Sequence, residues 1–123
     1  MKVFLVDDSS KVLEKLSTMI SRIDGLKIAG QALNARDAIQ SIVKLKPEVV
    51  ILDIRLDNSG NGMDVLKEIK RENPSPIVIM LTNYAYPQYR KKCQALGADY
   101  FFDKVTEIDT VYDTIKQLLR DGL

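Results

Sequence analysis

The chain of 123 residues contains no histidine and no tryptophan, and its single cysteine is Cys93. The lack of histidine excludes histidine-based catalytic triads, histidine metal ligands and a phosphohistidine on this chain. A single cysteine cannot form a disulfide within the chain, and the N-terminus lacks the charged start, apolar middle and cleavage site of a secretory signal. We therefore expect a cytoplasmic location.

Long apolar runs and a strong charge imbalance are also absent. No run approaches the ~18 apolar residues that span a bilayer, so we expect no membrane segment. The formal net charge is +1, which favours no direct contact with nucleic acid or with an anionic membrane surface. With 46% hydrophobic and 28% charged residues, the chain can form a core, and its length predicts one domain over residues 1–123.

Short apolar runs alternate with stretches of helical periodicity along the whole chain. The runs are rich in β-branched or aromatic residues, as in strands buried on both faces, and lie at residues 3–6, 27–32, 49–52, 77–81 and 100–102. Ser9 or Ser10 is a plausible N-cap of the first helix and Gly25 its stop, Asn34 starts the second helix, and Thr106 begins the fifth. Five strand–helix units predict a parallel sheet in a doubly wound, three-layer α/β sandwich.

Polar residues follow four of the five predicted strands. Asp7 and Asp8 follow the first, Asp53 the third, Thr82 the fourth and Lys104 the fifth, whereas the second ends without a charged residue. Ligands of open α/β sheets bind at the carboxyl ends of the strands. If the strand order is 2-1-3-4-5, these five side chains converge on one site.

Carboxylates packed together need a counter-charge, because two of them about 4 Å apart repel by roughly 4 kcal/mol at an effective dielectric near 20. Oxygen ligands without cysteine or histidine suit Mg²⁺ or Mn²⁺. Such an ion, with Lys104 and the Thr82 hydroxyl, can handle a phosphoryl group, and Asp53 is the best placed nucleophile. Taken singly, each aspartate could be a turn or N-cap residue, but four coincident strand ends argue against that interpretation.

Four segments together resemble the receiver (CheY-like) domain of two-component response regulators. They are "VFLVDDSS", "PEVVILDIRL", "IVIMLTN" and "LGADYFFDK". The resemblance covers the whole chain and implies a flavodoxin-like fold and a phosphorylation switch. It implies that Asp53 accepts a phosphoryl group from a sensor histidine kinase or a phosphotransfer protein. Asp8, Asp53 and the backbone carbonyl of Arg55 would bind the metal ion, with Asp7 helping through water.

The same resemblance implies how the signal leaves the site. Thr82 and Lys104 would hold the phosphoryl oxygens, and Phe101 matches the family's switch aromatic, which turns inward when Thr82 moves. The fourth helix, fifth strand and fifth helix would respond. All five tyrosines of the chain follow Thr82, which favours a surface for a downstream protein or for self-association, with half-buried packing as the alternative.

Two departures from the family pattern stand out. Val105 follows Lys104 where the family usually has a proline after a cis bond, so we expect either a trans bond or a strained cis bond. The segment "DNSGNG" carries an extra residue before Gly62 and is predicted to form a mobile loop beside the site. We also hypothesise that Arg55 and Tyr84 flank the path of the water that hydrolyses the aspartyl phosphate.

Three other functions fit these residues less well. A receiver-like scaffold that binds a partner without phosphorylation is favoured by the two departures, and the retained site residues argue against it. A flavin carrier of the same architecture would meet repulsion between its phosphate and the acidic pair Asp7 and Asp8. A hydrolase with an aspartyl nucleophile is disfavoured because no second acid lies two residues after Asp53.

Overall fold

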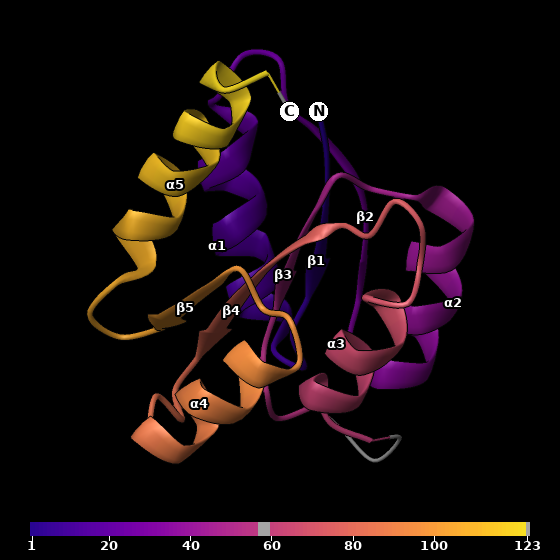
Figure 1. Cartoon of the computed structure of the whole chain (residues 1–123). Helices are drawn as coiled ribbons and strands as arrows, with labels where there is room; N and C mark the ends of the chain where they lie inside the picture. The colour runs from indigo at the N-terminus through magenta and orange to yellow at the C-terminus, as the bar shows by residue number, and fades with distance from the viewer. Residues whose placement is uncertain (57–59, 123) are drawn as a thin grey trace.

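The computed structural model describes residues 1–56 and 60–122. Its elements alternate strictly between strand and helix (Figure 1). All strands are parallel in the order β2-β1-β3-β4-β5, which confirms the predicted sheet. The strands are β1 (Lys2–Val6), β2 (Lys27–Ala32), β3 (Val49–Leu52), β4 (Ile77–Thr82) and β5 (Tyr100–Asp103). The helices are α1 (Ser10–Ser21), α2 (Ala35–Leu45), α3 (Gly62–Ile69), α4 (Pro87–Ala95) and α5 (Ile108–Arg120).

Helices cover both faces of the sheet. In Figure 1, α1 and α5 lie on one side and α2, α3 and α4 on the other. Alternate β1 residues point to opposite layers: Leu5 packs with buried residues of α1 and α5, and Phe4 with those of α2 and α3. The alternation follows from the two-residue repeat of a strand. The three-layer sandwich is thus confirmed, and the carboxyl ends of the strands meet along one edge.

Helix starts agree with the sequence better than helix ends. Ser9 caps α1 and Asn34 caps α2, each through a side-chain oxygen that accepts a backbone N–H. The predicted stop at Gly25 was too late, because α1 ends at Ser21 and the chain then turns before reaching the glycine. The predicted start of α5 at Thr106 was two residues early, since the helix begins at Ile108.

Two further expectations concern the edges of the site. Among the described peptide bonds, the cis bond joins Asn73 to Pro74, so Lys104–Val105 is trans, one of the two geometries expected. Residues 57–59 of the predicted mobile loop lie outside the described residues. No helix in the described part of the chain combines the length and apolar character needed to span a bilayer.

Candidate functional site: an acidic pocket at the carboxyl edge of the sheet

The buried strands carry the predicted site residues to the same edge. Asp7 continues β1 and Asp53 continues β3, each held by a backbone hydrogen bond to the neighbouring strand, from Asp7 N–H to Ala32 and from Asp53 N–H to Val6. The chain passes from β5 to Lys104, whose N–H binds the Thr82 carbonyl at 2.9 Å. The strands thus fix the backbone beneath these side chains before any ligand binds.

Lys104 forms ion pairs with two carboxylates at once. Its Nζ lies 2.6 Å from Asp7 Oδ2 and 2.7 Å from Asp53 Oδ2. Asp7 is 2% exposed and Asp53 5% exposed, so both carboxylates are largely removed from water. A buried carboxylate needs a partner charge and hydrogen bonds. Lys104 therefore supplies a positive counter-charge to both carboxylates, in addition to the metal ion that the sequence predicts.

The second oxygen of each buried carboxylate accepts a backbone N–H. Asp53 Oδ1 accepts from Ile54 at 2.7 Å, and Asp7 Oδ1 accepts from Ser9 at 2.9 Å. Each carboxylate is therefore oriented at both oxygens, one by the backbone and one by Lys104. This arrangement fixes Asp53 Oδ2 as the oxygen that faces the ammonium group.

Burial and pairing act on the pKa values in opposite directions. Burial raises the pKa of Asp7 above its usual value, and the hydrogen bonds from Lys104 and Ser9 only partly offset that rise. Burial also lowers the pKa of Lys104, but its hydrogen bonds to Asp53 and Asp7 outweigh this, so the pKa is raised overall. Ionised Asp7 is thus held at a cost beside a firmly protonated Lys104.

Asp8 completes a set of three carboxylates. It is exposed, unlike its neighbour Asp7, and one oxygen from each of Asp7, Asp8 and Asp53 lies within 4.8 Å of the others. The donor set contains oxygen alone, which fits Mg²⁺ or Mn²⁺ and does not fit the cysteine and histidine preference of structural zinc sites. The residues present therefore suit the metal that the sequence implied.

Thr82 reaches the site but its hydroxyl is engaged elsewhere. The side chain is fully buried, and Oγ1 accepts the N–H of Tyr84 at 3.0 Å. No hydrogen bond joins this hydroxyl to Asp53 or Lys104 among the described residues. The structure thus gathers Asp7, Asp8, Asp53 and Lys104, and leaves Thr82 bound to the loop after β4.

Arg55 and Tyr84, each two residues beyond a predicted site residue, contact each other. The guanidinium carbon of Arg55 lies 4.7 Å from the centre of the Tyr84 ring, and Arg55 Nη1 donates a hydrogen bond to the Tyr84 hydroxyl at 3.3 Å. The two residues follow β3 and β4, which are neighbours in the sheet. The sequence placed both beside the site, but it gave no sign of this direct contact.

Gly62 supports the backbone of the site, a role that was not predicted from the sequence. It begins α3, and its N–H donates to the Ile54 carbonyl at 2.6 Å. A Cβ at this position would lie 1.8 Å from the Asp53 carbonyl oxygen. Only glycine permits α3 to approach the backbone of Asp53 and Ile54 this closely. A glycine at the first position of a helix is the feature of the sequence that could have indicated this close approach.

Phe101, the predicted switch aromatic, lies in β5 and is buried, with 8% of its surface exposed. It pairs with Met80 of β4, two residues before Thr82 on that strand. The ring belongs to the same hydrophobic cluster as Met80 and Cys93. The guanidinium of Arg90 covers it, a contact that the sequence did not predict.

A doubly wound parallel sheet with an acidic, lysine-paired pocket at its carboxyl edge defines a class of α/β switch domains. Residues 3–116 match the model of the response regulator receiver domain, so the chain belongs to that family. It is therefore a signalling domain of the two-component kind.

The relatives agree on the domain and differ beyond it. A transcriptional regulatory protein of Bacillus subtilis, YvfU, is 30% identical over 119 residues, covering 97% of this chain and 59% of that protein. A protein-glutamate methylesterase/protein-glutamine glutaminase of Treponema denticola is 30% identical over 125 residues, covering 96% of this chain and 33% of that protein. The response regulator domain of Thermotoga maritima CheB matches with a TM-score of 0.85 and 26% identity, over 99% of this chain and 95% of that one. The chain thus spans about a third to three fifths of these two curated relatives.

Proposed function

We propose that Asp53 is the phosphoacceptor of a Mg²⁺-dependent switch. The observation that carries this proposal is the buried Asp53 carboxylate, held between the Ile54 N–H and the Lys104 ammonium, with two further carboxylates beside it. The strand end gives the carboxylate a fixed position, and fixed geometry lowers the barrier to phosphoryl transfer. The protein would act as a signalling switch whose own site promotes its phosphorylation and dephosphorylation.

The transfer forms one bond and breaks one. An oxygen of Asp53 attacks phosphorus, a new P–O bond forms, and the bond from phosphorus to the donor's leaving group breaks. With a sensor histidine kinase or a phosphotransfer protein, that leaving group is an imidazole nitrogen on the partner, because this chain has no histidine. Lys104 already contacts Asp53 Oδ2 at 2.7 Å and can follow the incoming negative charge.

Metal binding is assigned to Asp8, Asp53 and the backbone carbonyl of Arg55, with Asp7 acting through water. When bound there, Mg²⁺ or Mn²⁺ would neutralise charge on the phosphoryl oxygens. Asp7 also holds Lys104 in place, since its Oδ2 accepts a hydrogen bond from Lys104 Nζ and its Oδ1 accepts one from Ser9 N–H. Exposed Asp8 has no such hydrogen bonds among the described residues and is the freer direct ligand.

Thr82 is proposed to bind a phosphoryl oxygen after phosphorylation. Its hydroxyl would then turn toward Asp53, and the hydrogen bond that it accepts from Tyr84 N–H would be lost or weakened. The loop that joins β4 to α4 would respond first. Phe101, Thr82 and α4 would thus carry the change to the surface formed by α4, β5 and α5, where a downstream protein or a second copy could bind.

The proposal on nucleic-acid and membrane contacts concerns only the 123 residues of this chain. We infer no direct nucleic-acid binding and no membrane contact by these 123 residues, whose net charge is +1. That inference does not extend to DNA binding by a longer protein, since the Bacillus subtilis relative is named as a transcriptional regulatory protein. A cytoplasmic location and a single domain over residues 1–123 remain part of the proposal.

The test is incubation with Mg²⁺ and acetyl phosphate followed by intact-mass measurement. The native chain is expected to gain the mass of one phosphoryl group, and the Asp53→Asn chain to gain none. Asp113→Asn, which removes an exposed carboxylate of α5 far along the chain, is the matched control and should be labelled normally. If the native chain gains nothing, the phosphorylation-independent scaffold replaces this proposal.

A further inference from the structure

Helix α4 is attached to the rest of the protein by few buried side chains. Cys93 is its buried residue among the described positions, and the N-cap residue Tyr86 makes no capping hydrogen bond with its side chain. Amphipathic helices normally gain most of their stability from a buried apolar face. Any further contact between α4 and the sheet therefore matters for where this helix lies.

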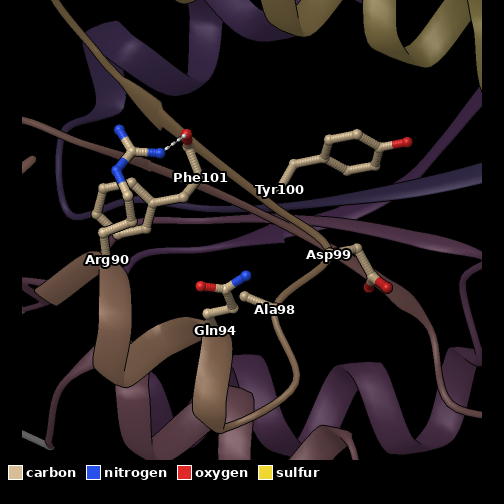
Figure 2. Close-up of a pocket in the computed structure, with 6 residues that line it drawn as sticks. All are labelled: Arg90, Gln94, Ala98, Asp99, Tyr100 and Phe101. Carbon is tan, nitrogen blue, oxygen red and sulfur yellow. Dashed lines mark hydrogen bonds between the residues drawn. The ribbon is translucent and has the colours of Figure 1, made fainter.

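Arg90 supplies such a contact, and it binds one residue in two ways. The guanidinium carbon lies 4.7 Å from the centre of the Phe101 ring, and Nη1 donates a hydrogen bond of 3.1 Å to the Phe101 carbonyl (Figure 2). The first contact restrains the ring, and the second ties the same arginine to the β5 backbone. Lysine could not reproduce this combination, because it lacks a planar group that stacks and donates at once.

The space beside Phe101 shows what Arg90 restrains. A surface hollow of about 270 Å³ is lined by Arg90, Gln94, Ala98, Asp99, Tyr100 and Phe101. In Figure 2, the Arg90 side chain lies over the Phe101 ring, and Gln94 extends from the same helix α4 while Tyr100 extends from β5. The ring has open space on this side and is kept at 8% exposure beneath the guanidinium. Outward rotation of the ring would therefore require displacement of Arg90.

We infer that Arg90 is a positioning residue that holds the switch aromatic Phe101 in its buried position and couples it to α4. The Phe101 ring cannot rotate out of its buried position while both Arg90 contacts are made. A shift of α4 must either break these contacts or displace β5. The link to phosphorylation rests on the proposed function of Asp53. The hold on the ring does not, because its two contacts join only Arg90 and Phe101.

The basic run on α4 supplies a matched control. Lys91 and Lys92 neighbour Arg90, are exposed, and carry the same charge without a ring beneath them. If the positive charge of α4 alone held the Phe101 ring, Lys91→Gln and Arg90→Gln would change the ring position equally. If the Arg90–Phe101 contact holds the ring, only Arg90→Gln would change the ring position.

The first experiment uses ¹⁹F NMR of the chain labelled with 4-fluorophenylalanine, without phosphodonor. The chain has three phenylalanines, and Phe101→Leu identifies the signal of interest. Arg90→Gln is expected to raise the exposed population of the Phe101 ring about tenfold, as the combined loss of a cation–π contact and a hydrogen bond implies. Lys91→Gln should leave the signal unchanged, and Arg90→Lys should give an intermediate shift. An unchanged Phe101 signal in Arg90→Gln overturns the inference.

A second experiment tests the coupling to α4 by amide hydrogen exchange, with and without acetyl phosphate and Mg²⁺. In the native chain, phosphorylation is expected to alter exchange in both β5 and α4. In Arg90→Gln, the β5 response should remain and the α4 response should be lost; a retained α4 response would overturn the coupling.

The two proposals fail in different ways. If acetyl phosphate adds no phosphoryl group but Arg90→Gln still frees the Phe101 ring, the phosphoacceptor proposal fails and the role of Arg90 stands. Should Arg90→Gln not fold, as judged by circular dichroism, Arg90→Lys decides the first experiment, because a Phe101 signal identical to that of the native chain contradicts the inference.

Discussion

The ammonium nitrogen of Lys104, just after β5, lies 2.7 Å from Oδ2 of Asp53, just after β3, although 51 residues separate them in the chain. The same nitrogen also pairs with Asp7. One cation thus balances two buried carboxylates, and this sharing determines how the pocket should respond to mutation, pH and metal.

Lys104→Met should destabilise the metal-free protein. Removing the lysine leaves Asp7 and Asp53 buried without a counter-charge, and breaking a buried pair in this way costs about 3 kcal/mol or more. The measurement is the free energy of unfolding from urea titration at neutral pH. Lys92→Met, which removes an exposed lysine, should change that free energy little. Equal effects of the two substitutions would show that Lys104 is not the counter-charge.

The contribution of Asp7 to the stability of the metal-free protein should be lost as pH rises from the usual Asp7 pKa of 3.8 through its raised folded value. In that range the folded protein binds the Asp7 proton more tightly than the unfolded chain does, so raising the pH favours unfolding. Asp7→Asn should abolish this part of the pH dependence. Urea midpoints measured in chelator across the acidic range provide the check, and an unaltered profile in Asp7→Asn would contradict the assignment.

At alkaline pH, we expect the loss of stability to reflect deprotonation of Lys104. Its pKa is raised in the folded state, so its contribution to stability is fully present below its usual value of 10.5 and is lost as pH rises through the folded value. Lys104→Met is expected to flatten this limb. The same denaturation series extended to high pH measures it, with Lys92→Met as the comparison.

Mg²⁺ should raise the melting temperature of the native chain. Saturation to about 100 times Kd stabilises the folded state by roughly 2.7 kcal/mol. Asp8→Asn should remove most of this effect, because Asp8 is the carboxylate of the set without a partner inside the described site. Thermal denaturation with Mg²⁺ and with chelator makes the comparison, and Asp24→Asn should respond to Mg²⁺ as the native chain does. A full Mg²⁺ shift in Asp8→Asn would place the ion elsewhere.

Tyr84→Ala should shorten the lifetime of the aspartyl phosphate severalfold. The Arg55 guanidinium carbon lies 4.7 Å from the centre of the Tyr84 ring, and by our hypothesis this pair shields Asp53 from the water that hydrolyses the aspartyl phosphate. Loss of phosphoryl mass after removal of acetyl phosphate gives the rate. Tyr86→Ala alters an exposed tyrosine of the same loop and should keep the native rate. An unchanged lifetime in Tyr84→Ala would contradict the hypothesis that this pair shields the aspartyl phosphate from water.

Gly62→Ala should disturb both the fold and the acceptor. The added Cβ would overlap the Asp53 carbonyl oxygen at 1.8 Å, so α3 must shift or the backbone of Asp53 must move. Overpacking of this kind typically costs 1–3 kcal/mol and sometimes more. Urea denaturation and the rate of labelling by acetyl phosphate should both be impaired; a native labelling rate would show that the acceptor tolerates the shift.

Much of the architecture was predictable because it depends on repeats within short segments. The short, continuous apolar run at residues 3–6 identifies a strand buried on both faces, and the caps Ser9 and Asn34 identify helix starts. Helix ends were less predictable: α1 stops at Ser21 and not at Gly25, because turns after a helix are decided by packing as well as by the residue that permits them.

The fold class could be predicted from the sequence because apolar runs and helical repeats alternate along it. The chemical types at the strand ends could be predicted as well, because Asp53 and its neighbours directly follow those runs. Tertiary structure alone decided the pairings: Lys104 with two carboxylates, Arg55 with Tyr84, and Arg90 with Phe101. The reason is physical. A periodic pattern specifies which face of an element is buried, whereas a hydrogen bond or ring contact depends on positions fixed to a fraction of an ångström by the packing of elements distant in the chain.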